Sequence, residues 1–198
     1  KEKGFYENVG LDVELKEYNP EVDILFDVLN NKVTYGISNS NIVLENKKIA
    51  SIVLLATYLQ KSPLVFITKP DIKTPSQFLG KTIMGNKDEL KNSSLALFLS
   101  HFNINFSNTK FIPHNFKIDD FINGKVEIMS AFRSNQLYEL DKRKIDYNII
   151  DPADYGFVMS AVNLYTPKEE AFKNKDRTQK FIEATNHGWE YALKNKEE

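Results

Sequence analysis

The pattern of hydrophobic and polar positions predicts strands and helices that alternate along the chain. Leu11-Asp12-Val13-Glu14-Leu15 alternates apolar and polar residues, which predicts a strand with one buried face, whereas the three- and four-residue spacings of Ile24, Leu25, Val28 and Leu29 predict a helix. The same criteria predict strands at 11–15, 33–37, 49–59, 64–67, 81–85, 110–113, 126–129 and 147–150, extended chain at 157–165, and helices at 22–30, 39–46, 89–101, 117–123, 133–143 and 175–194. The alternation predicts an α/β fold with mostly parallel sheets flanked by helices and joined by right-handed crossovers.

One local pattern occurs twice. Residues 27–33 read Asp-Val-Leu-Asn-Asn-Lys-Val, and residues 120–126, which lie 93 positions further along, read Asp-Phe-Ile-Asn-Gly-Lys-Val. Each copy ends an amphipathic stretch, passes an Asn or Gly suited to a left-handed helix cap, and enters an apolar strand. The repeat predicts one helix–turn–strand unit in each of two similar halves, with a cleft between them.

A segment with two prolines predicts where the chain first crosses between the halves. Residues 69–75 contain Pro70 and Pro75 and show no periodicity, while the Thr74-Pro75 pair predicts a short helix that ends at Gly80. The middle third has its own strands and helices, so we expect a discontinuous lobe 1 (residues 1–69 and 157–198) and a lobe 2 (residues 70–156), joined by a hinge. Both ends are helical in pattern, and we expect at least one element upstream.

Composition excludes several classes of function. The 198 residues are 41% hydrophobic, which is enough for a core, and 26 basic against 27 acidic residues provide no single-sign surface for nucleic acid or an anionic membrane. The absence of cysteine excludes thiolate metal sites, iron–sulfur clusters and a cysteine nucleophile. No apolar run approaches the roughly 20 residues that span a bilayer. His101, His114 and His187 lack metal-ligand spacing, so we expect no metal or cofactor.

Two catalytic motifs fail on inspection. Residues 36–40, Gly-Ile-Ser-Asn-Ser, resemble a nucleophile elbow, but Ser40 replaces the final glycine. Residues 80–82, Gly-Lys-Thr, resemble the end of a phosphate-binding loop, but Pro75 replaces the first glycine and a strand follows. An enzyme that uses His114 and Asp154 as acid and base remains an alternative. A purely structural interaction module is a third class, which the polar strand ends disfavour.

The candidate ligand-binding residues follow the predicted strands, because ligands of open parallel sheets bind at the carboxyl ends of the strands. They are Ser38, Asn39, Ser40, Gln60, Ser62, Asn86, His114, Asn115, Ser130, Phe132, Asn135, Asp154, Tyr155 and Gly156. Amides, hydroxyls and aromatic rings dominate this set. We therefore expect a cleft for an uncharged or weakly polar heterocycle, since a dicarboxylate or phosphate would require more arginine.

Several segments together resemble one protein family. Residues 3–13, Lys-Gly-Phe-Tyr-Glu-Asn-Val-Gly-Leu-Asp-Val, resemble the opening of thiamine-pyrimidine-type (NMT1-like) periplasmic solute-binding proteins, and residues 35–40, 60–65, 122–126 and 150–156 resemble later motifs of that family in the same order. The resemblance implies a type II periplasmic-binding-protein fold with two hinged lobes, whose first strand would precede Lys1. It also implies that the domain binds a pyrimidine-like ligand, such as a thiamine precursor, or another small nutrient.

The family resemblance implies a periplasmic or extracytoplasmic location and two possible settings. One is the solute-binding component of an ABC transporter, which works with a membrane permease; the other is the sensor ectodomain of a membrane protein with a fused signalling domain. The pyrimidine-synthesising branch of the family relies on a cysteine-rich iron site, which this chain lacks. The family often has Ser-Asn-Glu-Pro where this chain has Ser-Asn-Gln-Leu at 134–137, and the missing Glu removes a charge partner for an aminopyrimidine. We expect non-catalytic solute binding, with an enzyme acting on a heterocyclic metabolite as the alternative.

Overall fold

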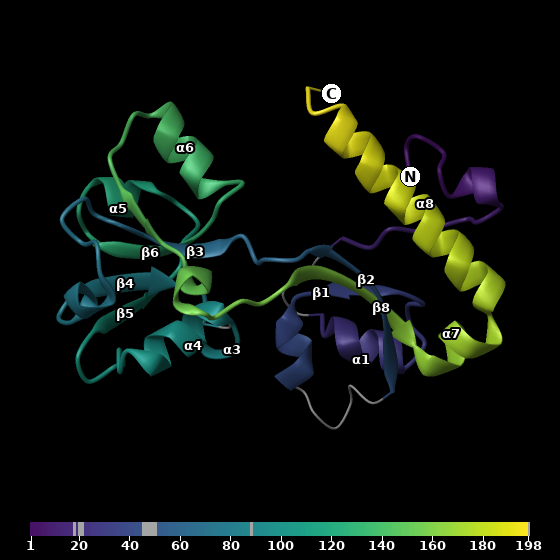
Figure 1. Cartoon of the computed structure of the whole chain (residues 1–198), viewed down its shortest axis with the longest axis horizontal. Coiled ribbons are helices and arrows are strands. Elements are labelled where there is room, and N and C mark those ends of the chain that lie inside the picture. The colour runs from purple at the N-terminus through teal and green to yellow at the C-terminus, as the bar shows by residue number, and fades with distance from the viewer. Residues whose placement is uncertain (18, 20–21, 45–50, 88, 198) are drawn as a thin grey trace. The chain divides into compact units, whose positions relative to one another are not determined.

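The computed structural model describes residues 1–17, 19, 22–44, 51–87 and 89–197, which fall into two units (Figure 1). Unit 1 consists of Lys1–Ser38, Glu45–Tyr58 and Val162–Glu198, and unit 2 consists of Asn39–Leu44 and Leu59–Ala161. The expected lobe boundaries differ from this division, because the sequence analysis assigned residues 39–44, 59–69 and 157–161 to lobe 1. Hydrogen bonds explain the difference for 64–68, since this strand pairs with two strands of unit 2.

Unit 1 contains a three-stranded sheet in the order β1-β8-β2, formed by β1 (Gly36–Ser38), β8 (Ala161–Pro167) and β2 (Ile52–Leu59). Strands β1 and β8 are antiparallel, with Gly36 opposite Tyr165. The helices of the unit are η1 (Glu7–Val9), α1 (Ile24–Leu29), α7 (Lys168–Lys173) and α8 (Lys175–Lys194). Phe181 of α8 stacks on Tyr35 with the ring centroids 3.8 Å apart, so the apolar face of the long helix contributes to the core.

Unit 2 contains a five-stranded mixed sheet in the order β5-β4-β6-β3-β7. Its strands are β3 (Leu64–Thr68), β4 (Thr82–Gly85), β5 (Lys110–Pro113), β6 (Ile128–Phe132) and β7 (Asn148–Ile150). Strand β4 is parallel to β5 and β6, whereas β3 is antiparallel to β6 and β7. The helices are η2 (Ser40–Leu44), η3 (Pro75–Phe78), α3 (Glu89–Asn92), α4 (Ser94–His101), α5 (Asp119–Ile122), α6 (Gln136–Lys142) and η4 (Pro152–Tyr155).

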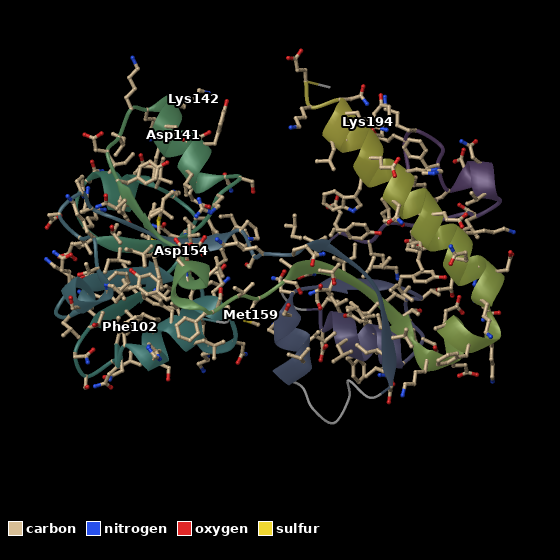
Figure 2. The ribbon with its side chains drawn as sticks, in the orientation of Figure 1. Phe102, Asp141, Lys142, Asp154, Met159 and Lys194 are labelled. Atoms are coloured by element: carbon tan, nitrogen blue, oxygen red, sulfur yellow. The ribbon has the colours of Figure 1, made fainter. Side chains whose placement is uncertain are left out.

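Alternate residues of the central strands of unit 2 face two separate cores. Leu64 and Phe66 of β3 belong to a cluster with residues of α4, including Phe98. Phe102, which is labelled in Figure 2, packs against Phe98. Val65 belongs to a second cluster with residues of α5 and α6. Helix α4 therefore covers one face of the sheet, and α5 and α6 cover the other (Figure 1).

The sequence repeat builds the same turn twice. Asn31 and Gly124 both have left-handed backbone conformations, with φ of 57° and 74°. The backbone N–H of the next residue, Lys32 or Lys125, donates to the carbonyl oxygen of Asp27 or Asp120 at 2.9 Å in both copies. The lysine Nζ also contacts the same aspartate Oδ1, at 3.0 Å in the first copy and 2.8 Å in the second. The predicted helix–turn–strand unit is thus confirmed as local structure in each half.

Some predicted elements differ from the structure. Residues 11–15 form no strand, and Leu15 is 60% exposed, because the alternating pattern finds no partner strand among the described residues. The predicted helix 89–101 is broken at Ser93, whose hydroxyl accepts a hydrogen bond from Leu95 N and caps α4. The five-stranded sheet is mixed rather than mostly parallel, since β3 pairs antiparallel with β6 and β7, and β1 of the other sheet is also antiparallel to β8. The predicted helix end at Asn46 and strand start at Ile49 lie outside the described residues.

A search of the described residues for membrane-spanning helices found none that is long and apolar enough to cross a bilayer. In the same part of the chain, no group of three or more His, Asp and Glu residues is arranged to hold a metal ion.

Candidate ligand-binding site

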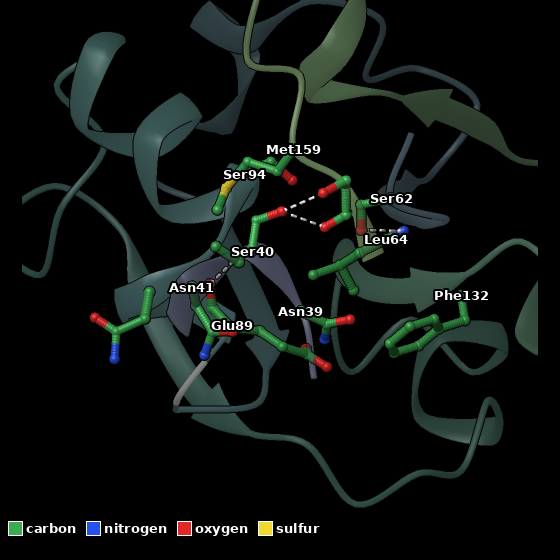
Figure 3. Close-up of a pocket in the computed structure, with 12 residues that line it drawn as sticks. Asn39, Ser40, Asn41, Ser62, Leu64, Glu89, Ser94, Phe132 and Met159 are labelled. Atoms are coloured by element: carbon green, nitrogen blue, oxygen red, sulfur yellow. Dashed lines mark hydrogen bonds between the residues drawn. The ribbon is translucent and has the colours of Figure 1, made fainter. Parts of the chain in front are cut away.

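A pocket of about 110 Å³ lies in unit 2, and all of its lining residues belong to that unit (Figure 3). The lining combines side-chain amides, hydroxyls, three apolar groups and one carboxylate. It is formed by Asn39, Ser40, Asn41, Ser62, Leu64, Glu89, Asn92, Ser93, Ser94, Phe132, Met159 and Ser160. Four of the candidate residues from the sequence are therefore brought together here, namely Asn39, Ser40, Ser62 and Phe132.

Hydrogen bonds hold one wall of the pocket. The Ser40 hydroxyl donates to the Ser160 carbonyl oxygen at 2.6 Å and lies 2.7 Å from the Ser160 hydroxyl, while Ser40 N donates to the same carbonyl at 3.2 Å. Ser62 N donates to the Met159 carbonyl oxygen at 2.7 Å. The segment around 159–160 is therefore tied both to η2 and to the loop before β3, which gives the pocket a defined polar edge.

Glu89, the first residue of α3, supplies the pocket's carboxylate. Its Oε2 accepts a hydrogen bond from the Ser130 hydroxyl at 2.8 Å and one from Asn86 N at 3.4 Å. Ser130 is 1% exposed, so a buried hydroxyl on β6 orients the glutamate. Figure 3 shows the Glu89 side chain extending into the pocket. The sequence analysis listed both Asn86 and Ser130 but missed Glu89; its place at a helix start shortly after a strand end was the available signal.

Two positively charged residues that neighbour pocket residues in sequence bind a buried aspartate and do not line the pocket. Ser62 and Phe132 line it, but their neighbours Lys61 and Arg133 do not. Lys61 Nζ and Arg133 Nη2 each lie 2.9 Å from Asp151 Oδ2, and Ala153 N donates to Oδ1 at 2.9 Å. Asp151 is 2% exposed. Burial by itself raises the pKa of Asp151, but the hydrogen bonds from Lys61, Arg133 and Ala153 outweigh burial and lower that pKa.

His114 and Asp154, the acid and base of the enzyme alternative, have separate partners. His114 Nδ1 accepts a hydrogen bond from Phe116 N at 2.8 Å, so the proton is on Nε2, which donates to the Ser130 carbonyl oxygen at 3.0 Å. The Asp154 side chain is 70% exposed and lies 3.6 Å from Lys61 Nζ. Neither side chain lines the pocket, and the arrangement lends the enzyme alternative no support.

The remaining candidate ligand-binding residues do not line the pocket. Asn115 donates to Asp120 Oδ2 at 2.7 Å, and Tyr155 packs its ring against Phe98, with 5.2 Å between the ring centroids. Gly156 has φ of 89° and ends η4. Ser38 ends β1 opposite Asn163 in unit 1, while Gln60 and Asn135 are exposed residues outside the pocket lining. Gln136 accepts a hydrogen bond from Phe132 N at 2.8 Å through Oε1.

The family model described as NMT1/THI5 like matches residues 1–198. No curated protein matches the chain. A search of solved structures shows the fold, since binding proteins and a VFT domain of 12–18% sequence identity superpose on it.

Three solved structures illustrate the range of proteins that share this fold. The periplasmic sulfonate-binding protein SsuA of Methylobacillus flagellatus has a TM-score of 0.65 and 17% identity over 88% of this chain, which spans only 55% of the SsuA chain. An ABC uptake transporter substrate-binding protein of Streptococcus pneumoniae with bound histidine has a TM-score of 0.64 and 18% identity over 97% of this chain and 79% of its own. The periplasmic VFT2 domain of BvgS from Bordetella pertussis has a TM-score of 0.58 and 12% identity over 93% of this chain and 74% of its own.

Proposed function

Because the chain belongs to the NMT1/THI5-like family, we propose that it binds a small solute without transforming it. In this proposal the two units correspond to the lobes of a solute-binding protein, and the segments that join them correspond to its hinge. The pocket of unit 2 contributes to the binding site. The single observation that carries the proposal is the composition of the pocket lining.

Eleven of the twelve lining residues are uncharged: three asparagines, five serines, Leu64, Phe132 and Met159. Amides and hydroxyls both donate and accept hydrogen bonds, so they recognise ring nitrogens, carbonyls and amino groups alike. The Phe132 side chain is 36% exposed and offers part of its ring for stacking. A small heterocyclic or weakly polar solute matches this combination of groups.

The location and the partner are parts of the same proposal. Structures with the same fold include a periplasmic sulfonate-binding protein and the periplasmic VFT2 domain of BvgS, which supports a periplasmic or extracytoplasmic location. A transporter component would act with a membrane permease, and a sensor ectodomain would act through a fused signalling domain. The gene sequence that follows Glu198 distinguishes the two settings, because only the sensor continues into a membrane-spanning segment and a signalling domain.

A thermal-shift screen followed by calorimetry tests the proposal. The panel contains pyrimidines, purines, amino acids and sulfonates, and we expect at least one ring solute to raise the melting temperature, since a ligand at 100 times its Kd stabilises the folded state by about 2.7 kcal/mol. Phe132→Ala should weaken binding of that solute by about tenfold through the lost stacking area. Phe106→Ala is the matched control, because Phe106 is 82% exposed and lies outside the pocket lining. A panel without any response contradicts the proposal.

A further inference from the structure

We propose that Glu89 makes the pocket selective for solutes that present a positively charged, N–H-rich group, such as an amidinium or a protonated amine on a ring, and that it excludes anionic solutes. This inference rests on the proposed solute-binding function and narrows its ligand class. Among the described residues that line the pocket, Glu89 alone carries a charge. Its carboxylate therefore sets the sign of the electrostatic potential that a solute meets there.

Two groups orient the Glu89 carboxylate, and both donate hydrogen bonds to the same oxygen. The Ser130 hydroxyl and Asn86 N both donate to Oε2, at 2.8 Å and 3.4 Å. Within the described part of the chain, no hydrogen bond reaches Oε1. An ionised carboxylate accepts hydrogen bonds but donates none, so a solute group that meets Oε1 has to bring its own N–H or O–H. A cationic donor forms the strongest hydrogen bond with Glu89, because hydrogen bonds between charged groups are roughly twice as strong as neutral ones.

Two cations that neighbour pocket residues in sequence, Lys61 and Arg133, bind Asp151. Lys61 and Arg133 flank the pocket residues Ser62 and Phe132 in sequence, yet neither lines the pocket, and both bind the buried carboxylate of Asp151. A sulfonate, phosphate or carboxylate in the pocket would therefore face the charge of Glu89 without a compensating cation among the described lining residues. Hydroxyls and amides alone do not offset that repulsion in a partly buried site.

Three probes of equal shape and different charge test the inference. Benzamidinium, benzamide and benzoate share a ring and a planar substituent of the same size, and their affinities are measured by calorimetry on the whole chain. We expect benzamidinium to bind at least about tenfold more tightly than benzamide, and benzoate to bind most weakly. Glu89→Gln should lower the benzamidinium affinity about tenfold and leave benzamide within about twofold.

Two further variants test whether the charge of Glu89 is the cause of the preference for benzamidinium. Glu89→Asp keeps the charge and should keep the preference for benzamidinium over benzoate, which distinguishes a charge effect from a damaged helix start. Glu139→Gln, on α6 and outside the pocket lining, should leave all three affinities unchanged. Tighter binding of benzoate than of benzamidinium, or a preference that survives in Glu89→Gln, overturns the inference while solute binding itself stands. Absence of binding by all three probes and by the wider panel overturns both proposals.

Discussion

The guanidinium of Arg133 donates a hydrogen bond to the carboxylate of Asp151 at 2.9 Å and so joins the end of β6 to the end of β7. These two strands are not neighbours, because β3 lies between them in the sheet. Lys61, which precedes β3, binds the same carboxylate oxygen, and Arg133 N donates to the Pro63 carbonyl oxygen at 3.0 Å. One buried aspartate therefore holds together the ends of three adjacent strands beside the candidate pocket.

Replacement of this aspartate should destabilise unit 2. Asp151→Asn removes the charge that compensates Lys61 and Arg133. We expect the free energy of unfolding to fall by about 1.5–3 kcal/mol, because the buried carboxylate loses charge-assisted hydrogen bonds while the two cations, which are nearly half exposed, stay solvated. Urea denaturation measures the change. Asp154→Asn is the control, because its side chain is 70% exposed and its contact with Lys61 should contribute less than about 1 kcal/mol. Equal losses in the two variants would contradict the role assigned to Asp151.

The same cluster should make stability depend on pH. The pKa of Asp151 is lower in the folded chain than its usual value of about 3.9, so its ionised form stabilises the fold at higher pH. This contribution is complete above the unfolded pKa and is lost as the pH falls through the folded pKa. We expect the difference in unfolding free energy between the parent chain and Asp151→Asn to be constant from about pH 7 to 5 and to shrink below about pH 4. A difference that grows on acidification would have the wrong sign.

The repeated turn supplies its own matched control. Gly124 has φ of 74°, where a Cβ is unfavourable, and we expect Gly124→Ala to lower the free energy of unfolding by about 1 kcal/mol. Gly124→Asn should cost less, because asparagine tolerates this conformation and Asn31 occupies the equivalent position of the first copy. Chemical denaturation of both variants gives the comparison. The explanation fails if alanine is tolerated as well as asparagine.

Two glycines should respond to alanine in opposite directions. A Cβ at Gly36 would lie 2.7 Å from Cζ of Tyr165 and 2.9 Å from Cγ2 of Val28, and both side chains are fully buried, so overpacking should cost about 1–3 kcal/mol. At Gly188, within α8, the nearest atom would be a Phe5 ring carbon at 3.9 Å. Gly188→Ala should therefore stabilise the chain by up to about 1 kcal/mol through helix propensity. Thermal denaturation tests the direction of the stability change in both variants. A Gly36→Ala variant with unchanged stability would disprove the close packing of β1 against β8.

Most individual elements could be predicted because their causes lie within a few residues. Helix α8 occupies the predicted residues 175–194, since its apolar positions recur at the helical period over five turns. The two copies of the Asp-to-Val turn could be predicted for the same reason, because each hydrogen bond and ion pair joins residues no more than six positions apart. The family resemblance also depended on such local segments and their order.

The sequence by itself determined most of the helices and strands, where the repeated tight turns lie, and that polar residues follow the strands. Only the tertiary structure decided that β3 runs antiparallel to its neighbours, that residues 11–15 form no strand with the described part of the chain, and that Glu89 is in the pocket while Lys61 and Arg133 are not. The contacts responsible are long-range: Ser130 and Glu89 are 41 positions apart, and Asp151 binds residues from two other loops. Periodicity reports which face of an element is buried, but which partner covers that face depends on the packing of the whole unit.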